Sequence, residues 1–240
     1  MYTEIKAAVE AQGLRIRAAF YPTPEDLVPP LENGAAAATL ILVGNAGSEL
    51  WPVFTHSAEY KDGFADPLDR WSKRLGLALA AEYQGAALFP FGGAPFHPFL
   101  SWAKRGDLSI SSPLGLSLHP QYGLWHAFRF ALSLPYRLED LPRSGDGLAS
   151  VNACHACLDQ PCLSACPVDA FTGSDYRALD CARFLRQTPD HACNHLGCGA
   201  RRVCPVGKNY QYQPEHACFH MRTFVADQVE RSVIKICANA

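Results

Sequence analysis

The sequence lacks three features that would each assign it to a broad class. No stretch of about 18 residues is apolar and free of charges and helix breakers, so we expect no membrane span and no membrane partner. The formal net charge is only -2, which argues against nucleic-acid binding through bulk positive charge. The N-terminus has no basic segment followed by an apolar one, so we expect no secretory signal and a cytoplasmic location with reduced thiols.

Cysteine is absent from the first 153 residues, and this absence divides the chain. All ten cysteines lie between Cys154 and Cys237. Residues 141–150, which come just before them, are rich in proline, glycine and serine, as is typical of a linker. We therefore expect two domains, over residues 1–145 and 151–240. A hydrophobic content of 48% and a charged content of 18% exclude a disordered chain.

The first of these segments alternates between helix and strand patterns. Helical apolar spacing occurs over residues 3–12, 66–83 and 98–105. Strand patterns occur over residues 14–18, 38–43, 86–90, 114–119 and 126–134. The run 38–43 is continuously apolar, which is typical of a central strand, whereas Arg15 and Arg17 alternate with apolar residues in a half-buried one. This interleaving predicts layered α/β or α+β architecture.

The cysteine segment opens with the spacing C-x2-C-x4-C-x3-C-P. The motif consists of Cys154, Cys157, Cys162, Cys166 and Pro167. Closely spaced thiolates of this kind can wrap one iron–sulfur cubane, while the proline directs the fourth thiolate toward a second cluster. A looser set ends in a second Cys-Pro pair and consists of Cys181, Cys193, Cys198 and Cys204. Eight thiolates are the ligand number for two [4Fe–4S] clusters.

In two-cluster ferredoxins, the last cysteine of each motif binds the cluster that the other motif holds. The same crossed pattern assigns the thiolates of this chain. The first cluster would be held by Cys154, Cys157, Cys162 and Cys204. The second would be held by Cys166, Cys181, Cys193 and Cys198. A ferredoxin-like domain carries electrons, and about 150 residues precede it. We therefore expect electrons to pass to something that the N-terminal domain holds.

Two other uses of the cysteines stay open. Zinc can bind cysteine-rich knuckles, and His155, His191 and His195 lie near the motifs. The two Cys-Pro endings and the eight thiolates favour cubanes over zinc. A disulfide framework would require an oxidising compartment, and no secretory signal indicates one.

Residues 119–129, His-Pro-Gln-Tyr-Gly-Leu-Trp-His-Ala-Phe-Arg, and the Leu-Glu-Asp-Leu-Pro stretch ending at Pro142 resemble the cobalamin-processing CblC family. The resemblance is clear over 110–142 and extends over 36–142. It implies an α+β, nitroreductase-like N-terminal domain that binds cobalamin with its lower base displaced. The corrinoid-binding candidates are Gly92, Gly93, His119, Tyr122, Gly123, Trp125, His126 and Arg129.

Structural roles for these candidates stay open beside the binding roles. His119 could make a backbone hydrogen bond at a strand end, and Trp125 could belong to the core. Arg129, on an alternating strand, could face solvent. Gly92 and Gly93 could let a flat macrocycle approach the backbone, or could form a plain turn.

The order of strand, Gly123-x-Trp125, strand, linker and cysteine motif also resembles the catalytic core of epoxyqueuosine reductase. Asp180-Cys181 and the segment from Gly197-Cys198 to Cys204-Pro205 resemble that family's later motifs. The chain departs from the family in three ways. The stretch 92–95 has no carboxylate where the family has its catalytic Asp, no helical-repeat domain follows the clusters, and positive charge is low. We therefore expect a shared architecture with a different substrate, and we do not expect tRNA as a partner.

Together the resemblances imply a corrinoid-binding iron–sulfur oxidoreductase. It would pass electrons from its clusters to base-off cobalamin, reduce cobalt and remove the upper ligand by decyanation or dealkylation. A reductase or a ferredoxin would donate the electrons, and a homodimer would match many nitroreductase-like proteins. The alternatives are an epoxyqueuosine-reductase-like, cobalamin-dependent reductase of another substrate, a non-catalytic electron carrier or B12 chaperone, and an FMN site. No catalytic residue is assigned.

Overall fold

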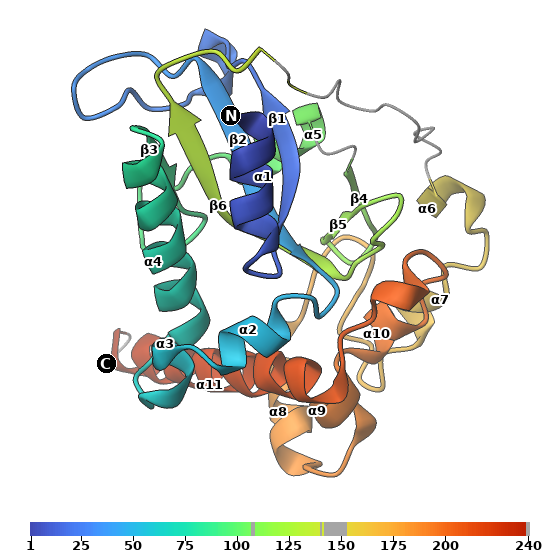
Figure 1. Ribbon diagram of the computed structural model, residues 1–240. Helices are drawn as coiled ribbons and strands as arrows, with labels where there is room; N and C mark the ends of the chain where they lie inside the picture. Colours follow the sequence, from blue (N-terminus) through green and yellow to red (C-terminus); the bar gives the residue numbers. More distant parts are fainter. Residues whose placement is uncertain (107–108, 140, 142–152, 239–240) are drawn as a thin grey trace. The chain divides into compact units, whose positions relative to one another are not determined.

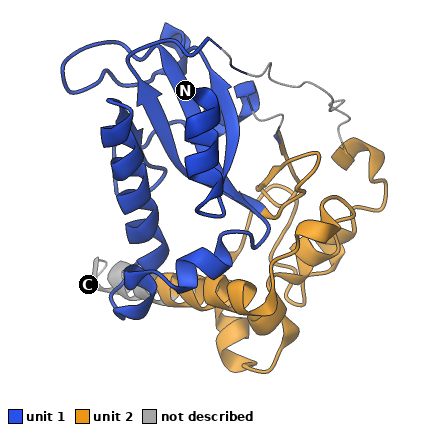
Figure 2. Ribbon diagram, in the orientation of Figure 1, with its two compact units in different colours: residues 1–109, 126–150 blue, residues 110–125, 151–240 orange. Residues whose placement is uncertain are grey.

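The computed structural model describes residues 1–106, 109–139, 141 and 153–238 (Figure 1). The chain divides into two compact units (Figure 2). We call Met1–Ser109 with His126–Ser150 the sheet unit, and Ile110–Trp125 with Val151–Ala240 the cysteine unit. The sequence pattern places one boundary near residue 150, whereas the compact units assign residues 110–125 to the cysteine unit.

A four-stranded sheet with the order β1-β2-β6-β3 forms the centre of the sheet unit. Its strands are β1 (Arg15–Phe20), β2 (Thr39–Ala46), β3 (Ala86–Leu88) and β6 (His126–Leu134). Every pair of neighbours is antiparallel, so the unit is α+β rather than α/β. Strand β2 is buried along its whole length, as its continuous apolar run predicts, and it continues beyond that run to Ala46.

Helices cover both faces of this sheet. The helix α4 (Pro67–Glu82) packs on β6 and β3, while α1 (Tyr2–Glu10) and α5 (Phe99–Gly106) pack on β1. Gly76 of α4 faces Phe130, and a methyl group added at Gly76 would lie 3.2 Å from that ring. Trp102 of α5 packs in a cluster with Ala131. Because neighbouring residues of a strand point to opposite faces, α4 and α5 cover opposite sides.

Two β-bulges interrupt the register of this sheet, and each adds an arginine. Arg17 is the extra residue of β1, and Arg129 is the extra residue of β6. A bulge turns its side chain out of the regular alternation. Arg17 is consequently buried rather than exposed, donates a 3.3 Å hydrogen bond to the Asn45 carbonyl oxygen and lies over the Phe128 ring. The expectation that Arg17 lies on the exposed side of a half-buried strand is wrong for this reason.

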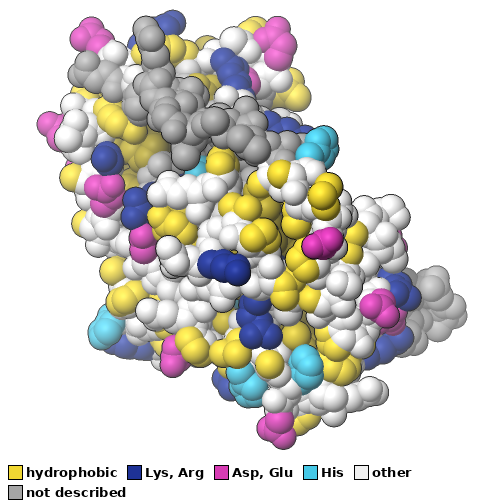
Figure 3. Space-filling model, turned by 90° about the vertical axis from the view of Figure 1, so that its right-hand side faces the viewer, with side chains coloured by type: hydrophobic (Ala, Val, Ile, Leu, Met, Phe, Trp, Pro, Cys, Tyr) yellow, Lys and Arg dark blue, Asp and Glu magenta, His cyan; other side chains and the backbone are white. Residues whose placement is uncertain are grey.

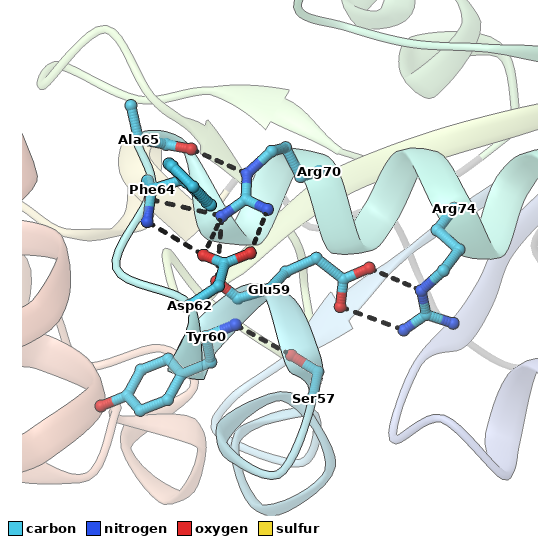
Figure 4. A network of polar contacts seen from close by, with 8 residues as sticks. All are labelled: Ser57, Glu59, Tyr60, Asp62, Phe64, Ala65, Arg70 and Arg74. Carbon is cyan, nitrogen blue, oxygen red and sulfur yellow. Dashed lines mark hydrogen bonds and ion pairs between the residues drawn. The ribbon is translucent and has the colours of Figure 1, made fainter.

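A polar network joins α4 to the short helix before it, α3 (Ala58–Lys61), which in turn follows α2 (Trp51–Thr55) (Figure 4). Arg70 donates two 2.7 Å hydrogen bonds to Asp62 and further bonds to loop carbonyl oxygens. Arg74 binds the Glu59 carboxylate at 2.5 and 3.2 Å. These bonds satisfy loop carbonyl groups that no regular element pairs.

The cysteine unit consists mainly of helices, most of them short. They are α6 (Ala153–Ala156), α7 (Pro161–Ser164), α8 (Ala178–Gln187), α9 (Ala192–Leu196), α10 (Gly199–Arg202) and α11 (Pro214–Ala238), with a strand pair β4 (Ile110–Ser111) and β5 (Ser117–Leu118). Single turns of helix are unstable alone, so tertiary contacts must hold them. Helix α11 packs on α8 and α9, and α10 packs on α7. In the described part of the chain, no helix is long and apolar enough to cross a membrane.

Candidate metal centre

Four cysteines from distant parts of the sequence line one pocket in the cysteine unit. Three of them, Cys154, Cys157 and Cys162, come from the first motif, and Cys204 comes from the second. Apolar side chains form most of the remaining wall, and Leu114, Leu118 and Leu124 of the segment 110–125 contribute to it. The pocket therefore combines thiol donors with a mainly apolar lining.

The electrostatics of this first group agree with its geometry. Burial raises the pKa of the Cys154 thiol above its ordinary value, and the nearby Cys204, Cys162 and Cys157 raise it further. Burial and Cys204 also raise the pKa of Cys162. Backbone N–H groups act in the opposite direction, with that of Val206 lowering the pKa of Cys204 and that of Leu163 lowering the pKa of Cys162. Backbone donors to sulfur stabilise the thiolate form, which is the form that binds metal.

A second group of thiols gathers around Cys181. Burial, together with the charges of Cys198, Cys166 and Cys193, raises the pKa of Cys181 to about 11, so these four thiols lie within electrostatic reach of one another. The Ala170 N–H donates a 3.3 Å hydrogen bond to the Cys166 sulfur.

Two neighbours of this second group were not identified from the sequence. The Tyr176 hydroxyl donates a hydrogen bond to the Cys181 sulfur and thereby lowers its pKa. The backbone N–H groups of Arg201 and Ala200, together with the Arg201 charge, oppose the rise that burial causes in the pKa of Cys198. A tyrosine five residues before a cysteine carries no spacing signal, so only the fold reveals this contact.

Among the described residues, no three or more His, Cys, Asp or Glu side chains converge as a site for one metal ion. Zinc bonds to sulfur of about 2.3 Å would require the four sulfurs to lie within about 4 Å of one another. A four-iron cluster spreads its thiolates over separate irons, so its ligands stand farther apart. The four thiols that line one pocket are the kind of donor set that such a cluster uses.

Two of the nearby histidines are engaged with the backbone. His191 accepts a 3.2 Å hydrogen bond from the Cys193 N–H through Nδ1 and so caps α9. His195 Nε2 lies 3.1 Å from the Pro189 carbonyl oxygen. His155 lies on α6 beside the first motif. One ring nitrogen of each of these two histidines is therefore engaged with the backbone.

The structure divides the predicted corrinoid residues between the units, and four of them lie in the cysteine unit. His119 Nδ1 accepts hydrogen bonds from the backbone N–H groups of Gln121 (3.1 Å) and Tyr122 (3.2 Å), and the His119 ring stacks on Tyr122 at 4.3 Å. His119 is buried and holds the turn that follows it. This is the structural role that the sequence left open.

Gly123 and Trp125 also have structural tasks in the cysteine unit. At Gly123 the chain adopts a positive φ of 59° and passes so close to Val206 that an added methyl group would overlap the Val206 carbonyl. Trp125 is 1% exposed and packs edge-on against Tyr212 at 5.3 Å. These contacts attach the segment 110–125 to the cysteine unit.

The other four predicted corrinoid residues lie in the sheet unit. His126 is buried at the start of β6, with its ring edge toward Phe128. Arg129 keeps only 12% of its side chain exposed and lies 3.9 Å from Asp69 of α4, so it does not simply face solvent. Gly92 and Gly93 both have positive φ, and the space where their side chains would be is open. Only the glycine pair leaves its backbone open to a flat ligand.

The chain is similar to a solved structure of another protein. It is described as "Crystal structure of epoxyqueuosine reductase with a tRNA-TYR epoxyqueuosine-modified tRNA stem loop", with 16% sequence identity and a TM-score of 0.42. The likeness covers 90% of this chain and 68% of that chain. No family model matches the sequence. No curated protein matches it.

The expectation that tRNA is not a partner is wrong, because the similar structure contains a tRNA stem loop. The charge argument failed because a net charge sums the whole chain and does not describe any one surface. On the face shown in Figure 3, Lys and Arg side chains lie among hydrophobic and uncharged groups, although the net charge is -2.

Proposed function

We propose that the chain is an iron–sulfur oxidoreductase that carries two [4Fe–4S] clusters in its cysteine unit. The observation that supports this most directly is the single pocket lined by Cys154, Cys157, Cys162 and Cys204. The last of these is distant from the others in sequence, and crossed ligand sets are typical of two-cluster ferredoxins. The grouping of the other four thiols around Cys181 supports a second cluster.

The chain's own residues would set the conditions for electron transfer. When bound, the clusters supply one-electron chemistry. Leu114, Leu118 and Leu124 form an apolar wall beside the first group of thiols. Backbone N–H groups and Tyr176 donate hydrogen bonds to the sulfurs, which in such sites adjusts the reduction potential.

For the acceptor, we propose a cobalamin-dependent reduction of the epoxyqueuosine-reductase type rather than removal of the cobalamin upper ligand. The support is the order of motifs, because that resemblance includes both cysteine segments whereas the CblC resemblance ends at residue 142. The candidate corrinoid contacts are then His126, Arg129, Gly92 and Gly93, because the cysteine unit uses His119, Gly123 and Trp125 for its own packing. An electron donor such as a reductase or a ferredoxin stays a prediction.

Anaerobic purification followed by iron, sulfide and zinc analysis tests the cluster proposal. We expect about eight irons and eight sulfides per chain, and about four irons in each of Cys162→Ser and Cys181→Ser. Zinc in place of iron would contradict the proposal, and so would loss of the same cluster in both variants.

Titration of the iron-loaded protein with hydroxocobalamin and cyanocobalamin tests the acceptor. We expect a base-off corrinoid spectrum with both, and a corrinoid that stays bound after reduction, with at most one upper ligand released per chain. Catalytic decyanation of excess cyanocobalamin would restore the CblC-like function. Resolved flavin bands in the purified protein would instead indicate FMN, and no response to corrinoid would leave an electron carrier.

A further inference from the structure

Helix α10 (Gly199–Arg202) connects the two groups of thiols. It follows Cys198, which belongs to the second group, and precedes Cys204, which belongs to the first. Arg201 lies three positions along the chain from each of these cysteines. Its charge acts on the Cys198 thiol. In the first group, the cation that lowers the pKa of Cys204 is Lys208, so the Arg201 charge acts on the second group through Cys198.

The Arg201 side chain is held in place by groups that carry no negative charge. Its Nη2 donates a 2.6 Å hydrogen bond to the Leu124 carbonyl oxygen. Its guanidinium carbon lies 4.5 Å from the centroid of the Trp125 ring and 5.2 Å from that of Tyr212. Cation–π contacts of this kind fix the guanidinium without neutralising it.

The charge of Arg201 is also uncompensated and partly withdrawn from water. Arg201 is half-buried, and its Nε is buried with no hydrogen-bond partner in the described part of the chain. Among the described residues it forms no ion pair with a carboxylate. Water and counter-ions screen such a charge less than an exposed one, so its field reaches farther.

We propose that Arg201 raises the reduction potential of the cluster held by Cys166, Cys181, Cys193 and Cys198, and so directs electrons toward that cluster. Adding an electron to a cluster makes its net charge more negative, and a nearby fixed cation stabilises the reduced form. Arg201 acts through its charge on the cluster, since it binds neither iron nor substrate. This inference rests on the proposed function.

The test is a redox titration of the full chain, followed by the electron paramagnetic resonance signals of the reduced clusters. Cys162→Ser, which keeps the second group, assigns the two reduction steps. In Arg201→Gln we expect the midpoint potential of the second cluster to fall, while Arg201→Lys stays near the unmodified protein because it keeps the charge. Arg183→Gln is the matched control, since Arg183 follows Cys181 closely but is 71% exposed and lies 3.5 Å from Asp180. We expect a smaller shift there.

Iron content is measured first, because it separates failure of the two-cluster function from failure of the role proposed for Arg201. Fewer than about eight irons in the unmodified protein would defeat the two-cluster function. A full iron load with an unchanged potential in Arg201→Gln would overturn only the role of Arg201. If Arg201→Gln loses iron, Arg201→Lys decides. Retention of both iron and potential in that variant supports the charge, whereas iron loss in both variants assigns Arg201 a purely structural role.

Discussion

The sheet unit and the cysteine unit are stabilised by different means. In the sheet unit, all eight residues of β2 are buried, and large side chains such as Trp71, Trp102 and Phe130 fill both faces. In the cysteine unit, α6, α7, α9 and α10 have only four or five residues each. Its core includes thiols, because Cys204 packs in one cluster with Leu114 and Leu118.

This difference separates folding by apolar burial from folding coupled to a ligand. Burial of β2 and the covering helices stabilises the sheet unit without any cofactor. In the cysteine unit the groups that would bind iron are also core residues, so loading and folding share the same contacts. Four predictions test this contrast, beginning with the one that has the largest expected effect.

Iron removal should unfold the cysteine unit selectively. We expect treatment of the iron-loaded protein with a chelator and reductant to abolish hydrogen-exchange protection in α8 and α9, because these short helices lose their common anchor. Amides of β2 and β6 should keep their protection. Mass spectrometry of exchanged peptides measures both regions in one sample, and equal loss in the two units would contradict the contrast.

Phe130→Ala should produce the opposite selectivity. Phe130 is fully buried between β6 and α4, and deleting such a ring costs about 3–5 kcal/mol of unfolding free energy. We expect chemical denaturation to show this loss while the iron content stays at that of the unmodified protein. Leu77→Ala is the control, because Leu77 lies on α4, the helix that covers Phe130, with half its surface exposed. Iron loss in Phe130→Ala would show that the units are not independent.

Gly123→Ala tests whether the segment 110–125 belongs to the cysteine unit. The substitution combines a positive φ with overlap against the Val206 carbonyl, and we expect a loss of about 2–3 kcal/mol together with reduced iron in the first pocket. Gly115→Ala shares a positive φ of 70° but meets open space, so it isolates the cost of the backbone conformation. Equal iron content in both variants would show that the segment 110–125 does not support iron binding in the first pocket.

Glu59→Gln should have the smallest effect, confined to the sheet unit. The hydrogen bond from Arg74 lowers the pKa of Glu59, so this pair stabilises the fold above the ordinary carboxyl pKa, and the contribution disappears as pH falls through the lowered value. We expect a loss of about 0.5–1 kcal/mol near pH 7 that shrinks once the pH falls below the ordinary carboxyl pKa. Thermal unfolding across this pH range measures it, and a difference that grows in acid would contradict the assigned sign.

The sequence by itself determined features that local spacing encodes. The continuous apolar run of β2 and the helical spacing of α4 identify those elements, because burial on two faces and on one face leave different periods in the sequence. Cysteine spacing likewise indicates the two sets of thiols, although their role as cluster ligands stays a prediction. The helices α2 and α3 were not predicted, since four or five residues are too few to show a period.

Tertiary structure decided which unit each of the remaining residues serves. The pattern around Gly123-x-Trp125 is continuous with the strand that follows it, yet a close backbone crossing at Val206 and the Arg201–Trp125 contact assign it to the cysteine unit. Bulges buried Arg17 and withdrew Arg129 from solvent, and neither bulge has a local sequence signal. These outcomes depend on contacts between residues far apart in the chain, and local spacing carries no information about them.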